Sequence, residues 1–170
     1  MRKDTNIRQL EKLIDEWQDS LYSFAFFRLG DEGAAQDVVQ EAFIRYYRES
    51  QRTVIGKPKA WLYRTTMNLA IDHLRRRPPI RAVSLSAALQ LEDESQRELY
   101  REYQRIEELL APLPDEQATV VRLHFTDDLS MAEIAEILNL PRDTVKSRYR
   151  YAMEKLKQRL NATGLRHKKQ

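Results

Sequence analysis

Hydrophobic residues recur every three or four positions along most of the chain, the spacing that places side chains on one face of a helix. The first such stripe contains Leu10, Leu13, Ile14, Trp17, Leu21, Phe24 and Ala25, and Gly30-Asp31-Glu32-Gly33 interrupts it. The second contains Val38, Val39, Ala42, Phe43, Tyr46 and Tyr47. A third helical stretch runs from about Lys59 to Arg77, and Pro78-Pro79 ends it because proline disfavours helix at the residue before it. The first 77 residues or so are therefore predicted to form three helices.

The second half of the chain continues the helical pattern. A helix is predicted from Gln96 to Leu110, and Asp115 is the expected N-cap of the next one. Ser130, with Glu133 three residues later, has the spacing of a capping box before a short helix. After the Leu140-Pro141 turn, a last helix is expected from Arg142 to Leu160. No strand-like alternation occurs, so the predicted fold class is all-α.

Between the two helical halves the periodicity fails. Residues 79–94 combine two serines, scattered alanine and leucine, and the acidic run Glu92-Asp93-Glu94. We therefore expect two small helical domains, residues 1–78 and 95–170, joined by a flexible linker over residues 79–94. A linker of this length reaches at most about 53 Å.

Composition excludes several classes of protein. The 170 residues contain no cysteine, three histidines and four glycines, which excludes a disulfide-stapled scaffold, a cysteine zinc site and a Gly-rich phosphate loop. Asp72 and His73 are adjacent and point about 100° apart on a helix, so they form no catalytic dyad. We expect no catalytic residue, no metal ligands and no cofactor. The charged N-terminus and the lack of a long apolar run predict a cytoplasmic protein without a membrane insertion.

The net charge of +3 conceals a strong segregation. Residues 57–77 and 142–159 each carry a net charge of +5, whereas residues 89–108 carry −4 and residues 115–138 carry −5. Two basic helices on separate domains suggest two contact regions for a polyanion. The alternative, that each is only a solvated helix face, remains open on charge alone.

The strongest local motif is SMAEIAEILNLPRDTVKSRYRY at residues 130–151. A short helix with Ile134, Ala135 and Leu138 inward, a three-residue turn and a second helix form the helix-turn-helix layout. The second helix would bury Val145 and Tyr149. Its outward residues are Arg142, Thr144, Lys146, Ser147 and Arg150, whose side chains suit phosphates and base edges. A helical hairpin with a basic exterior is the structural alternative.

Both halves together resemble a bacterial RNA polymerase sigma factor of the extracytoplasmic-function (ECF) group. DVVQEAFIRYYR (37–48) and KAWLYRTTMNLAIDHLRRR (59–77) are similar to the family's regions 2.2 and 2.3–2.4. LPDEQATVVRLHF (113–125) and LSMAEIAEILNLPRDTVKSR (129–148) are similar to regions 4.1 and 4.2. The resemblance covers Leu10 to Leu160 and implies a transcription initiation factor that binds core polymerase, directs it to −10 and −35 promoter elements and assists opening.

The resemblance also assigns residues. It implies that Asp37, Gln40 and Glu41 bind the β′ clamp coiled coil of core polymerase. The β subunit of the polymerase is a second expected partner. The residues implied to meet the −10 element, together with the loop 50–59, are Trp61, Asn68, Asp72, Arg75, Arg76 and Arg77. Trp61 either contacts the −10 element or belongs to the core, and the sequence leaves this open. The resemblance also implies that a base extruded from the −10 element is captured on this face, and Tyr63 is a second aromatic residue expected near that base. The residues implied to meet the −35 element are Arg142, Thr144, Lys146, Ser147, Arg148 and Arg150.

Three residues depart from the family pattern. Asp143 stands where a small residue is common, Pro141 where serine is frequent, and Tyr151 where arginine is more usual, so the effect of Asp143 and Tyr151 on −35 recognition is open. By the resemblance, an anti-sigma factor is a further partner. Its identity, the promoter sequence, the regulon and the inducing signal do not follow from the chain.

Two other classes of function fit the sequence less well, a free-standing DNA-binding regulator and an enzyme. A free-standing helix-turn-helix regulator leaves the matches at 37–48 and 59–77 unexplained. An enzyme would need a nucleophile–base pair or a metal cluster. The acidic segment 92–108 suits a solvated linker helix better than a DNA-mimicking inhibitor element.

Overall fold

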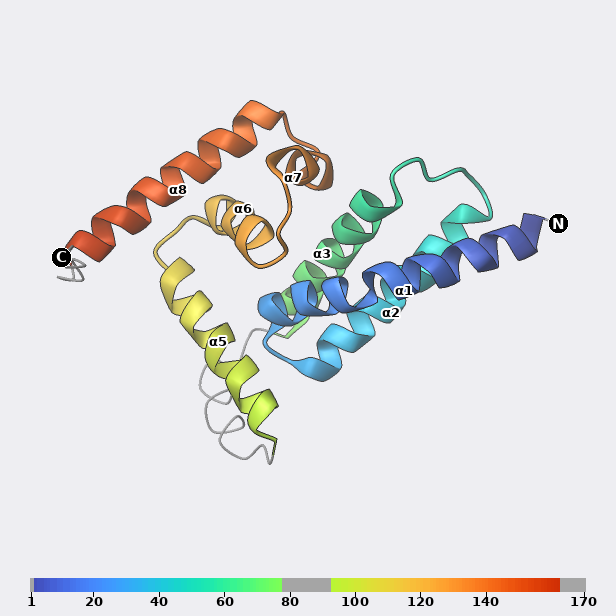
Figure 1. The fold of residues 1–170 in the computed structure, drawn as a ribbon, viewed down its shortest axis with the longest axis horizontal. Coiled ribbons are helices and arrows are strands. Elements are labelled where there is room, and N and C mark those ends of the chain that lie inside the picture. The colour runs from blue at the N-terminus through green and yellow to red at the C-terminus, as the bar shows by residue number, and fades with distance from the viewer. Residues whose placement is uncertain (1, 78–92, 163–170) are drawn as a thin grey trace. The chain divides into compact units, whose positions relative to one another are not determined.

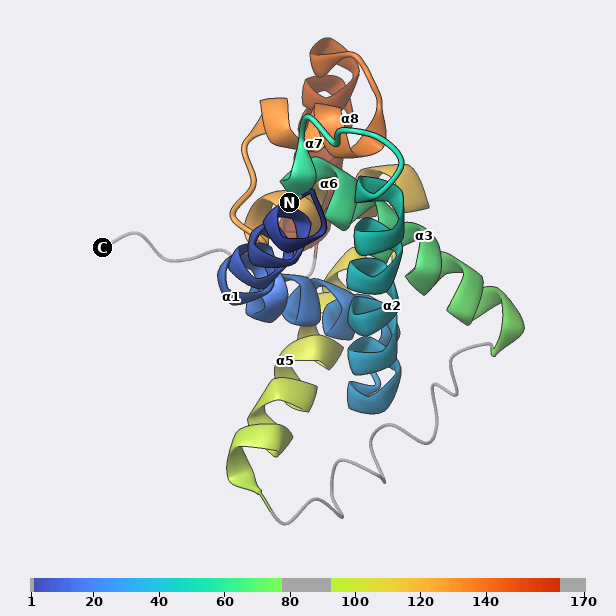
Figure 2. The ribbon, with the colours of Figure 1, turned by 90° about the vertical axis from the view of Figure 1, so that its right-hand side faces the viewer.

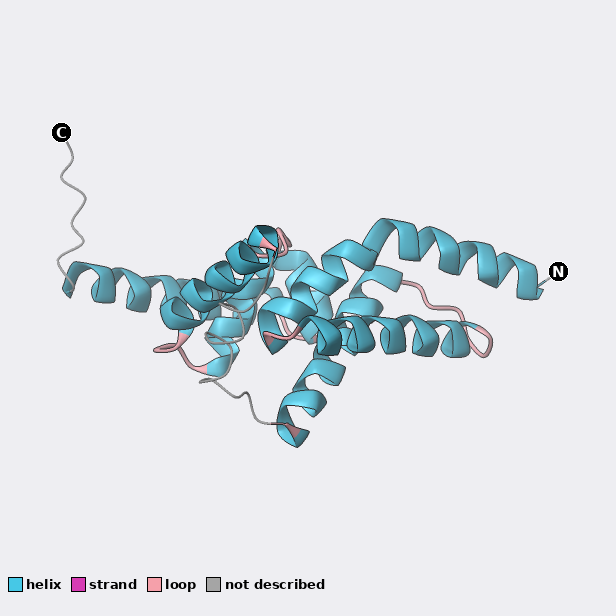
Figure 3. Cartoon of the chain, turned by 90° about the horizontal axis from the view of Figure 1, so that it is seen from below, coloured by secondary structure: helices cyan, strands magenta, loops and turns pink. Residues whose placement is uncertain are grey.

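The computed structural model describes residues 2–77 and 93–162 of the chain. Every regular element within these two ranges is a helix, as Figure 3 shows by its cyan colouring, which confirms the all-α fold class. The chain divides into two compact units, residues 1–103 and 104–170. Apart from residues 93 and 94, the expected linker lies outside the described residues.

The first unit begins with α1 (Arg2–Leu29) and α2 (Glu32–Ser50), which pack against each other (Figure 1). Gly30 ends α1 with φ +67°, a left-handed conformation that glycine adopts at little cost. Asp31 then caps α2, because its side chain accepts a hydrogen bond of 2.6 Å from the backbone N–H of Ala34. The expected interruption at 30–33 is thus a tight corner between two antiparallel helices.

The third helix, α3 (Pro58–Arg76), follows the loop 51–57, which joins the adjacent ends of α2 and α3 in Figure 2. Pro58 suits the first helical turn, where no backbone donor is needed. On the packed side of α3, Leu62, Thr66 and Ala70 are buried, while Leu69 and Leu74 are half-buried. Together α1, α2 and α3 form a three-helix core.

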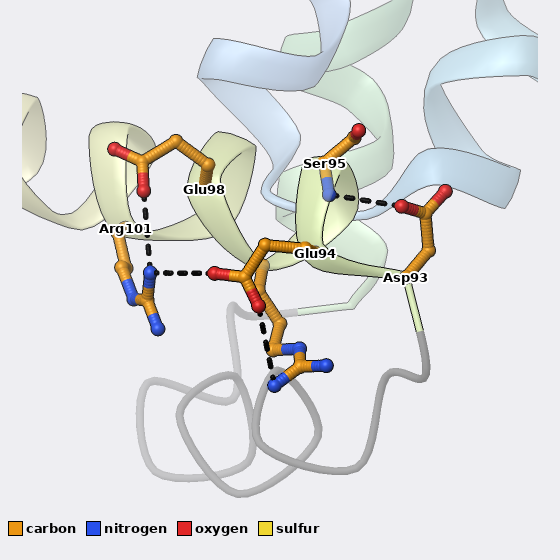
Figure 4. A network of polar contacts seen from close by, with 6 residues as sticks. Asp93, Glu94, Ser95, Glu98 and Arg101 are labelled. Atoms are coloured by element: carbon orange, nitrogen blue, oxygen red, sulfur yellow. Dashed lines mark hydrogen bonds and ion pairs between the residues drawn. The ribbon is translucent and has the colours of Figure 1, made fainter.

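Helix α5 (Glu94–Leu110) begins two residues earlier than expected. The Asp93 side chain accepts a hydrogen bond of 2.9 Å from the Ser95 N–H at this end of the helix (Figure 4). Residues 94–103 belong to the first unit, where the rings of Tyr100 and Tyr103 pack on Phe26 at centroid distances of 5.3 and 5.9 Å. The division into units therefore falls within α5, whereas the sequence suggested a second domain starting at residue 95.

The second unit contains the end of α5, α6 (Asp115–Phe125), α7 (Met131–Leu138) and α8 (Arg142–Ala162). One cluster of its core contains Leu110, Leu113, Ala118, Val121, Ala152 and Leu156. The expectation that Asp115 caps α6 was wrong. Pro114 occupies the cap position without a side-chain hydrogen bond, and Asp115 lies inside the first turn, where its charge favours the helix N-terminus.

The capping box before α7 is confirmed. The Ser130 hydroxyl accepts a hydrogen bond from the Glu133 N–H at 3.2 Å, and the Glu133 carboxylate accepts one from the Ser130 N–H at 2.9 Å. Asn139 leaves the helix with φ +53° and starts the turn to α8. Ile134 and Ile137 are the buried residues of α7, whereas Ala135 and Leu138, which we expected inward, are half-buried.

Candidate polymerase and DNA interfaces

The outer face of α2 carries the residues expected to bind polymerase. Asp37 and Gln40 are exposed, and Glu41 is half-buried. They occupy positions i, i+3 and i+4 and so share one side of the helix, while the opposite side is buried through Val38, Ala42 and other core residues. The Glu41 carboxylate accepts a hydrogen bond of 2.7 Å from Arg45. We call Asp37, Gln40 and Glu41 the α2 surface.

An apolar residue borders this surface. Ile44 is 45% exposed, three residues after Glu41 and four after Gln40. An exposed apolar side chain surrounded by charged and amide groups is the usual composition of a protein–protein contact, an apolar centre with a polar rim. Ile44 was missed in the sequence because it read as one more apolar residue of a helix, and only burial distinguishes it from its neighbours.

On α3, all the residues expected to contact the −10 element are exposed except Trp61. Asn68, Asp72, Arg75, Arg76 and Arg77 are all exposed, at or beside the C-terminal half of the helix. The Asp72 carboxylate lies 3.8 Å from the Arg75 guanidinium, and both side chains are well exposed. Such an exposed pair is weak, so a phosphate could readily displace it. We call Asn68, Asp72 and the three arginines the α3 surface.

The aromatic residues of α3 do not join this surface as expected. Tyr63 is 1% exposed and packs edge-on against Phe24 at 5.4 Å, so it was wrong to expect it near a captured base. Trp61 is half-buried and meets Tyr46 edge-on at 5.5 Å, which supports the core alternative while leaving part of the ring accessible. Nearby, Lys59 of α3 lies 4.5 Å from the Trp17 ring of α1, a cation–π contact between distant residues that has no signal in the sequence.

On α8, most of the expected −35 residues share the face away from the core. Arg142, Lys146 and Arg150 are exposed, and Thr144 and Ser147 are half-buried. The buried residues of the helix are Val145, Ala152 and Leu156. Tyr149, expected inward, is half-buried, with its ring 5.2 Å from that of His124. We call Arg142, Thr144, Lys146, Ser147 and Arg150 the α8 surface.

Arg148 is the exception among these residues. It follows buried Val145 by three positions and precedes buried Ala152 by four, which places it beside the packed side of α8. Its guanidinium lies 3.2 Å from the Glu116 carboxylate of α6, and its side chain is only 24% exposed. Arg148 therefore connects two helices of the second unit, and Glu116 is a partner that sequence reasoning missed.

The segment before α7 contains a perturbed carboxyl group. Burial raises the pKa of Asp127 to about 7, and its Oδ2 atom is buried without a hydrogen-bond partner among the described residues. Two residues later, the Leu129 carbonyl lies 2.9 Å from His124 Nδ1. Because a carbonyl only accepts, Nδ1 carries the proton of that bond. The Asp127 carboxyl group, in the segment before the helix-turn-helix, therefore changes its charge near neutral pH.

The acidic start of α5 is internally paired. Arg101 lies 3.2 Å from both Glu94 and Glu98, and Arg97 lies 3.4 Å from Glu94 (Figure 4). These exposed pairs at helical spacing fit a solvated helix better than an isolated acidic surface.

Within residues 2–77 and 93–162, no cluster of three or more potential metal ligands occurs. In the same ranges, no helix is both long and apolar enough to cross a membrane.

Comparison with known proteins assigns both halves. The family model described as Sigma-70 region 2 matches residues 13–78, and the model described as Sigma-70, region 4 matches residues 109–158. The ECF RNA polymerase sigma factor SigW of Bacillus subtilis is 32% identical over 162 residues, covering 87% of each chain. This chain belongs to the ECF RNA polymerase sigma factors. The ECF sigma factor SigL of Mycobacterium tuberculosis is also 32% identical, over 92% of this chain and 91% of its own.

A solved structure has a similar fold over nearly the whole chain. CnrH, in complex with the cytosolic domain of CnrY, matches with a TM-score of 0.70 and 25% sequence identity, covering 95% of this sigma factor and 93% of CnrH. The resemblance read from residues 37–48, 59–77 and 113–148 is confirmed. This sigma factor acts in transcription initiation, and the α2 and α3 surfaces lie within region 2 while the α8 surface lies within region 4.

Proposed function

We propose that this sigma factor docks on core RNA polymerase through the α2 surface and binds promoter DNA through the α3 and α8 surfaces. One observation carries the proposal: each unit has an exposed basic helix, and the two helices fall within the separate region 2 and region 4 matches. Two basic surfaces in separate units suit two separated promoter elements, −10 for α3 and −35 for α8.

Polymerase docking rests on the chemistry of the α2 surface. Asp37 and Glu41 offer carboxylates and Gln40 an amide, groups that pair with a basic helix such as one of the β′ clamp coiled coil. Ile44 adds an exposed apolar contact beside them. In this proposal the β subunit holds the second unit, so both units are attached to one larger enzyme.

DNA binding divides between positioning and reading. On α3, Arg75, Arg76 and Arg77 bind phosphates, and Asn68 reads an unpaired −10 base, since its amide both donates and accepts. Opening of the duplex follows capture of that base. On α8, Lys146 and Arg150 bind the −35 duplex while Thr144 and Ser147 reach base edges.

The remaining parts of the proposal follow from this division. The segment 79–94 connects the region 2 domain (1–78) to the region 4 half of the chain (95–170), of which residues 95–103 pack with the first unit. Such a connection raises the effective concentration of the second contact. The sigma factor works in the cytoplasm without enzymatic activity or cofactor, since the polymerase supplies the chemistry. The structural neighbour CnrH was solved in complex with the cytosolic domain of CnrY, and we propose that this chain likewise has a protein partner, an anti-sigma factor.

The docking assignment is tested by co-purification with core polymerase. The variant Asp37→Lys/Glu41→Lys should lose at least tenfold in affinity, because opposing charges at an interface become like charges. The matched control is Glu11→Lys/Asp15→Lys, an exposed acidic pair of α1 with the same spacing of four residues. Equal affinity for the two double variants, with both folded by circular dichroism, would contradict the assignment.

A further inference from the structure

The solvent-facing side of α8 contains an aromatic residue that the α8 surface does not yet include. Tyr151 is 52% exposed, although tyrosine carries a large apolar ring. It follows Ser147 by four positions and Thr144 by seven, so the three residues lie along one side of the helix. The buried residues Val145, Ala152 and Leu156 lie on the other side. Tyr151 therefore extends the row of residues proposed to face DNA.

The ring of Tyr151 also has a charged neighbour. The Arg150 guanidinium carbon lies 5.2 Å from the ring centroid, within the range of a cation–π contact. This contact restrains a long side chain that otherwise samples many rotamers, and a guanidinium held in advance loses less freedom when it binds a phosphate. Tyr151 is thus placed to position Arg150.

The place of Tyr151 along α8 indicates what its own hydroxyl would meet. Nine residues separate it from the start of the helix at Arg142, an axial distance of about 13 Å. A recognition helix reads bases with its N-terminal residues in a groove about 12 Å wide. A side chain this far along the helix reaches the sugar-phosphate rim of the groove, where a phenol hydroxyl can donate to a phosphate oxygen.

We propose that Tyr151 is a DNA-contact residue of region 4, its ring positioning Arg150 and its hydroxyl donating a hydrogen bond to a backbone phosphate. The inference rests on the proposed function of α8. Because the hydroxyl is neutral, this contact binds a phosphate without releasing a counterion, in contrast to the contacts of Lys146 and Arg150. Affinity would then include a component that does not vary with salt concentration.

The test measures duplex affinity of the holoenzyme at several salt concentrations. The probe is the promoter fragment that the unmodified holoenzyme selects from a library of bacterial promoter fragments. Tyr151→Phe keeps the ring and loses the hydroxyl, so affinity should fall by about fivefold with the salt slope unchanged. Tyr151→Leu should lose more, because Arg150 also loses its ring. Tyr151→Arg should steepen the slope by about 0.9, the value for one added phosphate contact.

Two controls keep the outcomes separate. Tyr149→Phe removes the same hydroxyl two residues away, where the ring packs against His124, and should leave affinity unchanged. Lys146→Gln tests the proposed function, since it should weaken binding and flatten the salt slope. If Lys146→Gln has no effect, the α8 surface is wrongly assigned. If Lys146→Gln acts while Tyr151→Phe matches Tyr149→Phe, or Tyr151→Arg leaves the slope unchanged, the role of Tyr151 is refuted.

Discussion

Gly30 lies directly against the ring of Tyr103. A Cβ atom at residue 30 would stand 2.8 Å from Cε1 and Cζ of that ring, closer than packed atoms approach. Gly30 also has φ +67°, which a residue with a side chain adopts only with strain. The corner between α1 and α2 therefore packs against α5 at a position where residue 30 has no side chain, and both Gly30 and Tyr103 belong to the first unit.

Replacing Gly30 by alanine should lower the free energy of unfolding of the first unit by about 1–3 kcal/mol, from backbone strain and the displaced Tyr103 ring. The matched control is Gly33→Ala in the first turn of α2. There a Cβ would meet only Asp31 Oδ1, at 3.4 Å, so alanine should stabilise by about 0.5–1 kcal/mol. Urea unfolding of the full chain compares the two, and equal midpoints for both variants would contradict the proposed packing.

Asp127 should make the second unit less stable as the pH rises. Its pKa of about 7 in the folded state lies above an unfolded value of about 3.9. Its contribution is therefore fully present below about pH 4 and is lost as the pH rises through 7. Asp127→Asn should flatten the fall in unfolding free energy between pH 5 and pH 8. Asp128→Asn changes the exposed neighbouring residue and should keep the fall. A fall of the same size in both variants would contradict the burial of Asp127.

The ion pair between Arg148 and Glu116 should couple α8 to α6. In a double-mutant cycle with Arg148→Ala and Glu116→Ala, we expect a coupling of about 0.5–1 kcal/mol in unfolding free energy, the range for a partly exposed pair. Additive losses would show that the pair contributes nothing.

For DNA, Arg148→Ala should reduce −35 occupancy in footprinting, but with a smaller change in salt slope than Lys146→Ala, because Arg148 is half-buried and already paired.

Asn68 and Lys146 should act at different steps of promoter engagement. Asn68→Ala should reduce opening, measured by permanganate reactivity of the separated strand, by roughly tenfold with little change in duplex binding. Lys146→Ala should show the reverse pattern, with weaker duplex binding and normal opening of each bound complex. Equal effects of Asn68→Ala on both steps would remove its role in base capture.

The helices could be predicted from the sequence because their signals are local. Gly30, Asp31 and the Ser130–Glu133 pair act within one helical turn, and the three- and four-residue spacing of apolar side chains follows directly from helix geometry. The N-cap of α6 was predicted one position too late, at Asp115. The true N-cap is Pro114, whose side chain has no donor or acceptor and so gives no capping signal in the sequence.

The candidate surfaces were predicted less completely, because burial depends on partners distant in the chain. Glu116 and Arg148 are 32 positions apart, and Phe26 and Tyr100 are 74 apart, so no local pattern indicates either contact. Tyr63 and Trp61 have similar chemistry, yet the core encloses the first and leaves the second partly accessible. The positions at which helices cross determine which of these side chains are buried, and the helical periodicity of the sequence does not give those positions.

The central claim is that both units of this sigma factor engage promoter DNA while attached to core polymerase. Transcription in vitro with purified core enzyme and a library of promoter fragments tests it most directly. The account predicts transcripts from defined start sites that require the added chain and disappear with Asp37→Lys/Glu41→Lys. Tight, specific binding of duplex DNA by the isolated chain, with no start-site-specific transcript from any bacterial core enzyme, would contradict it.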